Sequence, residues 1–148
     1  MPVLTENRRA YFDYEILEKY EAGIQLAGFE VKSMRSGRIN LAGSYALIRN
    51  GEAWLLNADI PPYQPANTPA GYESNRTRKL LLKRPEIKEL DGKLSQKGLT
   101  LLPLKVYTKG RRIKVELGLA QGKRQHDKRE QLKKRVATRE IARTLKRY

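Results

Sequence analysis

Apolar and polar side chains alternate over residues 12–26, which is the clearest hydrophobic pattern in the chain. An apolar side chain at every second position is typical of a half-buried β-strand. Only Glu18 interrupts the series, so we predict one long strand, or a bent pair of strands, with Glu21 and the other odd positions facing outward. The apolar even positions are Phe12, Tyr14, Ile16, Tyr20, Ala22, Ile24 and Leu26.

Two segments have the signals of short helices. Residues 28–35 are followed closely by a glycine, a common residue just past a helix end, and Lys32 and Arg35 share one face of this helix. From Pro85, apolar residues recur at spacings of three and four until Gly98 closes the segment. We therefore predict a helix in each segment.

The remaining segments predict strands and loops. Asn50 and Gly51 are a favoured pair for a two-residue hairpin turn, and they separate two predicted strands at residues 45–49 and 52–57. Four prolines then indicate a long surface loop: Pro61, Pro62, Pro65 and Pro69. Two more strands follow at residues 99–107 and 112–119, and the odd positions of the second are apolar and turn inward.

This succession predicts a mainly β fold with short helices. Several short antiparallel strands joined by tight turns favour a small barrel, which leaves few exposed edges. We favour an antiparallel β-barrel like the oligonucleotide-binding (OB) fold, whose curved outer face suits nucleic acid. Periodicity alone does not separate this barrel from other small barrels.

Charge narrows the choice of partner. The chain has 31 Lys plus Arg against 16 Asp plus Glu, a net charge of +15, which points to a polyanion such as nucleic acid or an anionic membrane surface. No apolar run reaches the roughly 18 residues of a spanning helix, and the first 15 residues lack a secretory apolar core, so we expect a cytoplasmic protein. The absence of cysteine and the single histidine exclude thiolate and multi-histidine metal sites, and we expect no cofactor.

The composition changes near residue 121. Residues 121–148 carry eleven cations and three carboxylates, about half of the net charge. Their apolar residues form only a thin stripe, too small to offset the entropy of ordering the segment. We therefore divide the chain into an RNA-binding body, residues 1–120, and a basic C-terminal tail, residues 121–148, which is disordered alone and helical when bound. The stripe consists of Leu132, Val136, Ile141 and Leu145.

Outward-facing basic side chains of the body predict a phosphate-binding surface, since cations that meet phosphates release bound counterions. The alternative is an ordinary soluble surface, which the net charge disfavours. Loop residues Tyr63 and Tyr72 are candidates for stacking on bases, whereas Tyr14 and Tyr20 on the apolar strand face should pack in the core. The basic candidates are Lys32, Arg35, Arg38, Arg76, Arg78, Lys79, Arg112 and Lys114.

Two acidic or titratable positions have more than one interpretation. Glu21 is either a surface acid paired with a neighbouring cation, the commoner role, or an acceptor for a base amino group or a ribose hydroxyl. His126, followed by Asp127, is a solvated histidine in a basic run, a ring that stacks on a base, or half of an acid–base pair. Adjacent residues rarely point at one atom, which disfavours catalysis.

Four stretches of the chain have distinctive sequences: NRRAYFDYE (7–15), YEAGIQLAGFEVKSMRSG (20–37), NRTRKLLL (75–82) and GLAQGKRQHDKR (118–129). They resemble the SsrA-binding protein (SmpB) family, and the resemblance covers nearly the whole chain. It implies an OB barrel that binds the tRNA-like domain of tmRNA (SsrA RNA) and delivers it to stalled ribosomes for trans-translation, without enzymatic activity. The family's RNA-binding positions fall on Glu21, Leu81 and Lys114; Leu81 either packs beneath the surface or touches RNA.

The resemblance also gives the tail a role. It implies that the tail probes the empty mRNA channel and the decoding centre, which are built from small-subunit rRNA, with His126 as the stacking residue. The implied partners are tmRNA, the ribosome and, indirectly, the elongation factor that carries aminoacyl-tmRNA; the protein is expected to be a monomer. The tail residues concerned are Gly122, Lys123, Arg124 (lysine in many members), His126, Asp127, Lys128 and Arg129.

Two rival functions remain. A generic ribosomal or ribosome-associated RNA-binding protein would use the tail only to add affinity for any structured RNA. A small ribonuclease would rest on His126, Asp127 and Glu21 alone.

Overall fold

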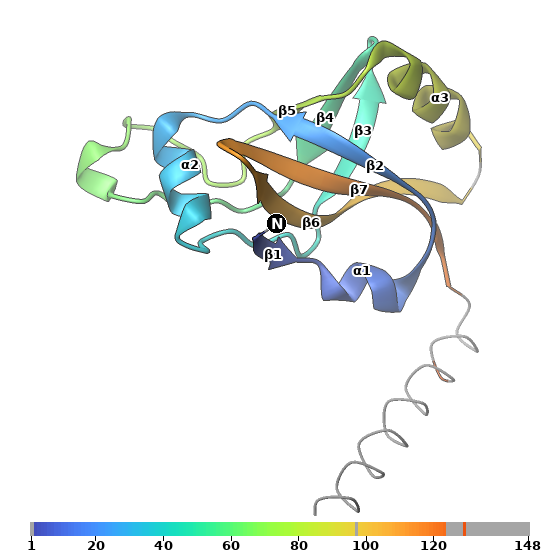
Figure 1. The fold of residues 1–148 in the computed structure, drawn as a ribbon, viewed down its shortest axis with the longest axis horizontal. Coiled ribbons are helices and arrows are strands. Elements are labelled where there is room, and N and C mark those ends of the chain that lie inside the picture. Colours follow the sequence, from blue (N-terminus) through green and yellow to red (C-terminus); the bar gives the residue numbers. More distant parts are fainter. Residues whose placement is uncertain (1, 97, 124–128, 130–148) are drawn as a thin grey trace, which may run out of the picture.

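The computed structural model describes residues 2–96, 98–123 and 129 of the 148-residue chain. The fold consists of a single antiparallel sheet with short helices packed around it (Figure 1). The elements are β1 (Val3–Glu6), α1 (Arg8–Asp13), β2 (Tyr14–Ile24), α2 (Gly28–Arg35), β3 (Tyr45–Arg49), β4 (Glu52–Leu56), η1 (Pro65–Asn67), β5 (Arg78–Leu81), α3 (Arg84–Leu94), β6 (Leu99–Lys109) and β7 (Arg112–Gly122).

The strands pair in a ring. Strand order β6-β3-β4-β5-β2-β7 returns to β6 through the long β6–β7 hairpin, and β1 joins β6 at its free edge. The shortest strand pairing in the ring joins β3 to β6 through a single pair of residues, Ala46 and Leu101. The prediction of a mainly antiparallel β fold with short helices is confirmed.

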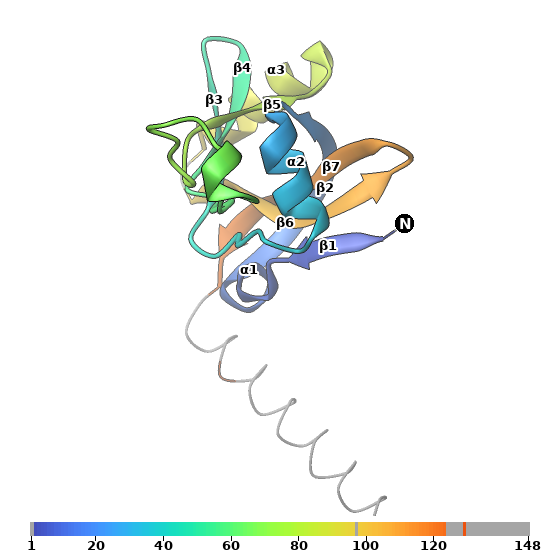
Figure 2. The ribbon, with the colours of Figure 1, turned by 90° about the vertical axis from the view of Figure 1, so that its left-hand side faces the viewer.

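Most of the apolar side chains pack inside this ring. Strand residues such as Ala22, Leu55, Leu80 and Val115 are buried in one cluster, which Leu90 of α3 also joins. A smaller cluster lies on the other face of β6 and β7, where α1 covers it. Its buried members are Ala10, Leu102, Leu104 and Ala120. Helices α1 and α3 lie at opposite ends of the described part of the chain (Figure 2).

The first predicted strand needs two corrections. Residues up to Asp13 form α1, which the alternation did not predict; Asn7 caps it by accepting a hydrogen bond from the amide of Ala10. A bulge at Leu17 then divides the ladder between β2 and β7 into two parts, one from Tyr14 to Ile16 and the other from Glu18 onward. Because the extra residue changes the phase, the even positions do not share one face. Tyr14 and Ile16 pack on the smaller cluster, whereas Tyr20 and Ala22 belong to the main one.

The other predicted elements agree with the structure apart from their ends. Helix α2 has the predicted bounds, and the hairpin turn has positive φ at Asn50 (53°) and Gly51 (74°), as its type requires. Strands β6 and β7 run two and three residues further than predicted. Strand β1 had no sequence signal. No helix of the described part of the chain is long and apolar enough to cross a membrane.

Gly118 in β7 leaves room for the side chain of Leu104. A Cβ at residue 118 would lie 2.8 Å from Leu104 Cδ1 and 3.0 Å from its Cγ, and Leu104 is fully buried. We expect Gly118→Ala to lower the free energy of unfolding by about 1–3 kcal/mol through overpacking, measured by urea denaturation. Gly92→Ala is the control: open space surrounds Gly92 in α3, so this variant should stabilise the protein. Equal effects of the two variants would contradict the packing argument.

Candidate RNA-binding surface

Strand register gathers Glu21, Leu81 and Lys114 on the outer face of the ring. Gly23 of β2 pairs with Leu81 of β5 on one side and with Lys114 of β7 on the other. Glu21 lies two residues before Gly23 on the same face, because side chains alternate along a strand. Three positions that are 33 to 93 residues apart in sequence therefore form one continuous surface.

Glu21 has protein partners on this surface. Its carboxylate accepts a hydrogen bond from the Tyr107 hydroxyl and one from Lys109 Nζ at 3.2 Å. These two hydrogen bonds, with smaller contributions from the charges of Lys109 and Lys114, lower the pKa of Glu21 below its ordinary value. The side chain keeps 39% of its surface exposed. The surface-acid interpretation thus describes the free protein, and Glu21 still offers an ionised acceptor to a ligand.

Leu81 is an exposed apolar side chain. It is 48% exposed and covers Gly23, where an added Cβ would lie 3.3 Å from Leu81 Cβ. Of its two predicted roles, packing beneath the surface does not fit this exposure. Leu81 instead presents an apolar contact between polar neighbours on the outer face.

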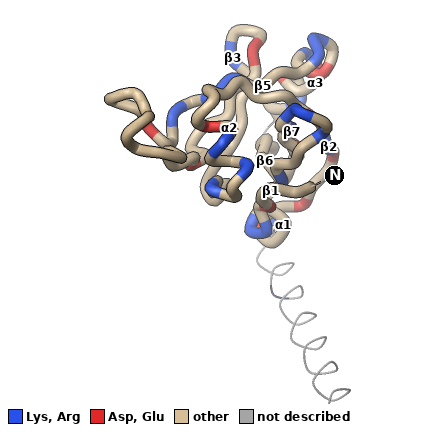
Figure 3. Tube along the Cα trace, turned by 60° about the vertical axis from the view of Figure 1, so that its left-hand side comes forward, with Lys and Arg blue, Asp and Glu red and all other residues tan. Residues whose placement is uncertain are grey.

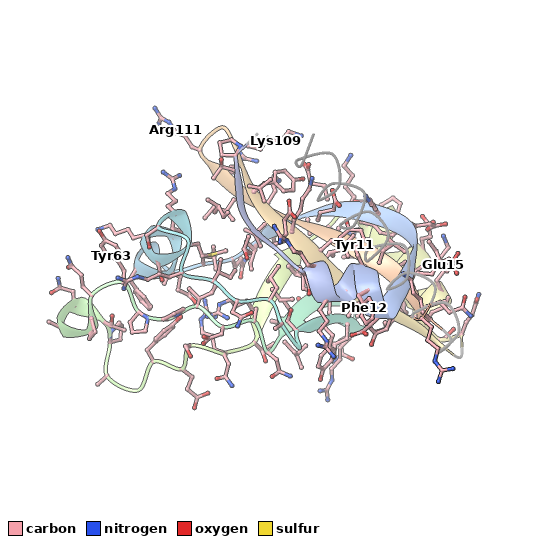
Figure 4. The ribbon with its side chains drawn as sticks, turned by 90° about the horizontal axis from the view of Figure 1, so that it is seen from below. Tyr11, Phe12, Glu15, Tyr63, Lys109 and Arg111 are labelled. Carbon is pink, nitrogen blue, oxygen red and sulfur yellow. The ribbon has the colours of Figure 1, made fainter. Side chains whose placement is uncertain are left out.

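Several of the exposed cations lie on two neighbouring elements, α2 and the β6–β7 turn. Arg35 Nη2 at the end of α2 donates to the carbonyl of Arg111 at 3.1 Å, which holds α2 beside the β6–β7 turn. Lys32, Arg38 and Arg112 are also exposed on these two elements or next to them. Figure 3 shows Lys and Arg positions along α2, and Figure 4 shows Lys109 and Arg111 at the tip of the β6–β7 hairpin.

Sequence reasoning missed two cations of this surface, Lys109 and Arg111, and the hydrogen bond of Tyr107 to Glu21. The run Lys109-Gly110-Arg111-Arg112 was a usable signal, since a turn glycine between cations places them at an exposed tip. Tyr107 had none, because its link to Glu21 depends on the pairing of β6 with β7 and of β7 with β2.

Arg78 corrects the predicted phosphate surface. Its side chain is 0% exposed, so the prediction that it faces outward is wrong. All five of its N–H groups donate within the protein, and none is left for a phosphate. The acceptors are Glu30 Oε2 (2.7 Å), the carbonyls of Ala58 (2.9 Å), Arg76 (3.1 Å) and Ser74 (2.8 Å), and the Tyr72 hydroxyl (3.0 Å).

Glu30 of α2 is the centre of this buried network. Its fully buried carboxylate accepts hydrogen bonds from both Arg76 and Arg78, from the Ala27 amide (2.8 Å) and from the Tyr72 hydroxyl (3.1 Å). Burial raises its pKa, but the hydrogen bonds from Arg76, the Ala27 amide and Arg78 outweigh burial and bring the pKa to about 2. The network joins α2 to the proline-rich loop and to β5.

The network also determines how far its other members, Arg76 and Tyr72, remain available to a ligand. Arg76 keeps 38% of its side chain exposed while it binds Glu30. Tyr72 is engaged by Glu30 and Arg78 and packs edge-on against Phe29 with the ring centroids 4.8 Å apart, so it is not free to stack on a base. Tyr63, the other loop candidate, is exposed (Figure 4).

Lys79 lies on the same outer face as Leu81, two residues before it on β5. Its Nζ forms an ion pair with Glu52 at 3.2 Å. About a third of the Lys79 side chain remains exposed (33%). Lys79 therefore keeps its predicted place on the surface, with one carboxylate neighbour.

The junction with the tail is anchored on α1. The backbone amide of Lys123 donates to the carbonyl of Asp13 (2.9 Å), and its Nζ donates to the carbonyl of Tyr11 (2.8 Å). Strand β7 itself ends at Gly122. Arg129 is exposed and helical. Arg124, His126, Asp127 and Lys128 lie outside the described residues. The prediction that the tail is disordered alone and helical when bound also falls outside them.

Comparisons with known proteins agree on one family. The family model described as SmpB protein matches residues 4–147. The SsrA-binding protein of Gloeothece citriformis is 58% identical over 146 residues, which cover 99% of this chain and 94% of that protein. That of Carboxydothermus hydrogenoformans is 56% identical and covers 97% and 96%.

A solved structure gives the same answer. It is described as "tmRNA-SmpB: a journey to the center of the bacterial ribosome", and one of its chains is 51% identical to this one. The two superpose with a TM-score of 0.69 over 88% of this chain and 94% of the other. Family model, sequence relatives and fold thus coincide over nearly the full length, and the chain belongs to the SmpB family.

Proposed function

We propose that this chain binds the tRNA-like domain of tmRNA (SsrA RNA) and delivers it to stalled bacterial ribosomes for trans-translation. One observation carries the proposal. The positions that match the family's RNA-binding residues, Glu21, Leu81 and Lys114, come from three strands and lie together on one outward face. Family membership supplies the identity of the RNA, and the net charge of +15 supplies the attraction to it.

The closed order of the strands supports reading the ring as an OB-like barrel. Its outer face then presents an ionised acceptor, an apolar contact and cations side by side. Phosphates would be met by the exposed cations of α2 and the β6–β7 hairpin, from Lys32 and Arg35 to Arg112. Arg76 contributes positive charge, since Glu30 neutralises only one of the two arginines that it binds. Lys79 contributes a partly exposed ammonium that is paired with Glu52 in the free protein. Arg78 holds Arg76 and Lys79 in position from inside the protein.

The tail, residues 121–148, is assigned to the ribosome. We propose that it enters the mRNA channel only when no message occupies it, since rRNA phosphates then offset the cost of ordering a cationic segment. Gly122 and Lys123 form its root, and His126 stacks in the decoding centre with Arg124, Asp127, Lys128 and Arg129 around it. The protein acts in the cytoplasm as a monomer, beside the elongation factor that carries aminoacyl-tmRNA.

A salt series tests the RNA assignment. Affinity is measured for the isolated tRNA-like domain and for an equal-length control tRNA at increasing salt. The charge contribution falls with a logarithmic slope of about −0.7 to −0.9 per phosphate neutralised, whereas specific contacts persist. We expect the preference for the tRNA-like domain to survive at high salt. Equal affinities that vanish together would favour the generic RNA-binding protein instead.

Glu21→Lys separates an acceptor from a mere surface acid. The substitution adds positive charge, so general electrostatics predict tighter binding of RNA. We expect the opposite, a loss of at least tenfold in affinity for the tRNA-like domain, because an ammonium cannot accept from a base amino group or a ribose hydroxyl. Fluorescence anisotropy with labelled RNA measures it.

Glu116→Lys is the matched control for this substitution. Glu116 of β7 pairs with Glu21 of β2, so the same change of charge is made at the neighbouring position on the same face. It should leave affinity within a few-fold of wild type. Unchanged or tighter specific binding by Glu21→Lys would show that Glu21 is a surface acid only.

A further inference from the structure

A second apolar group lies on the outer face of the ring, on the β3–β4 hairpin. We call Leu47, Trp54 and Leu56 the tryptophan patch. Neither apolar cluster includes them. Leu47 pairs with Trp54 across the hairpin, while their neighbours Ala46 and Leu55 turn into the core. The patch is therefore apolar surface that the core does not use.

The patch is hollowed and has a polar rim. Leu47, Trp54 and Leu56 line a surface cavity of about 350 Å³ together with Arg49, Asn50, Glu52 and Thr77. Arg49 and Asn50 are exposed at the rim, and Glu52 is held there by Lys79. An apolar floor edged by a guanidinium, an amide and a carboxylate matches a nucleobase, which has an aromatic face and a polar edge.

The patch is continuous with the surface proposed to bind RNA. Trp54 pairs with Lys79 of β5, and Leu81 follows two residues later on the same face of that strand. Strand spacing and rise place Trp54 and Leu81 only ~8 Å apart at their Cα atoms. An RNA lying across Leu81 and Lys114 can thus reach the patch without leaving the outer face.

We propose that Trp54 stacks on an unpaired nucleobase of the RNA that binds at Glu21, Leu81 and Lys114. The inference rests on the proposed function and adds a base-binding subsite to it. Stacking on one aromatic side chain strengthens single-strand binding by roughly five- to a hundred-fold per base. Asn50 and Glu52 lie at the rim where they meet the polar edge of the base, and Arg49 faces its phosphate.

The single tryptophan of the chain makes the test direct. The full chain is titrated with the tRNA-like domain while Trp54 emission and the anisotropy of labelled RNA are followed in parallel. We expect emission to be quenched at the same RNA concentration that saturates the anisotropy, and quenching by acrylamide to fall at least twofold. Abasic substitution of unpaired nucleotides, one at a time, then identifies the stacked base.

Variants supply a second readout. Trp54→Leu should lower affinity about tenfold or more, while Trp54→Phe, which keeps an aromatic face, retains most of it. Leu17→Ala, at an exposed apolar side chain (44%) on the bulge of β2, should stay within twofold. If Trp54→Leu does not fold, the emission of the wild-type chain still shows whether Trp54 contacts the RNA.

The outcomes separate this inference from the proposed function. Saturable anisotropy with unchanged Trp54 emission and acrylamide quenching overturns the subsite and leaves the proposed function standing. Protection of Trp54 by ribosomes but not by the RNA assigns the patch to a ribosomal component and also overturns it. If neither the anisotropy nor the Trp54 emission shows RNA binding, the subsite and the proposed function are overturned together.

Discussion

Removal of residues 124–148 is expected to abolish peptide tagging on stalled ribosomes while leaving affinity for the tRNA-like domain within a few-fold of the full chain. We place the cut after Lys123 rather than at the predicted boundary near residue 121, because Gly122 still belongs to β7 and Lys123 anchors on the carbonyls of Tyr11 and Asp13. The candidate surface for tmRNA lies wholly within the retained residues, so the two activities should separate.

Charge must be controlled in this experiment. The removed residues carry ten cations and three carboxylates, so unspecific affinity will fall in low salt. The comparison is therefore made at a salt concentration where the control tRNA no longer binds. His126→Ala in the full chain tests the decoding contact with the charge retained. Tagging that survives the truncation would defeat the division of roles, and a parallel loss of tmRNA affinity would favour the generic RNA-binding protein.

Glu30→Gln is expected to cost about 3–5 kcal/mol of unfolding free energy, the largest effect on stability in this set. Arg78 is fully buried beside Glu30, so the variant leaves a buried guanidinium without its counter-charge. The matched control is Glu52→Gln, whose ion pair with Lys79 is partly exposed on both sides and should be worth less than about 1 kcal/mol. Chemical denaturation of both variants at neutral pH measures the difference, and equal costs would contradict the role of the network.

The pH dependence of the same pair gives an independent check. The pKa of Glu30 is about 2 in the folded protein and 4.5 ordinarily. Because the folded pKa is lowered, the stabilising contribution is complete above pH 4.5 and is lost as the pH falls from 4.5 towards 2. The shift corresponds to about 3 kcal/mol. The stability gap between wild type and Glu30→Gln should therefore narrow over this range of pH.

The same network bears on RNA binding. It fixes α2, which carries Lys32 and Arg35, against the strand that carries Lys79 and Leu81. A chain that folds but loses this connection would present its cations and its apolar contact at variable separation. Affinity of Glu30→Gln for the tRNA-like domain should thus fall even under conditions where the variant remains folded.

Local signals determined much of the fold. The Asn50–Gly51 turn, the α2 segment and the apolar alternation in β7 predicted their elements because each depends on residues next to one another. The prediction of the first strand was wrong at its start and at Leu17, where contacts with other parts of the fold overrode the alternation. The Asn7 cap and buried Ala10 make residues 8–13 helical, and the bulge at Leu17 sends Tyr14 and Tyr20 to different faces.

The sequence by itself determined the β class, the basic character, the candidate tail and the family motifs, since composition, turn residues and alternation are local properties. Only the tertiary structure decided that Arg78 is internal, that Tyr107 and Lys109 hold Glu21, and that Trp54 lies on the same face as Leu81. The physical reason is strand register. On the outer face, partners that are 25 to 88 residues apart are brought together by the ladder between strands, and no local pattern encodes which residue of one strand faces which residue of the next. Arg78 meets Glu30 only because α2 packs against β5.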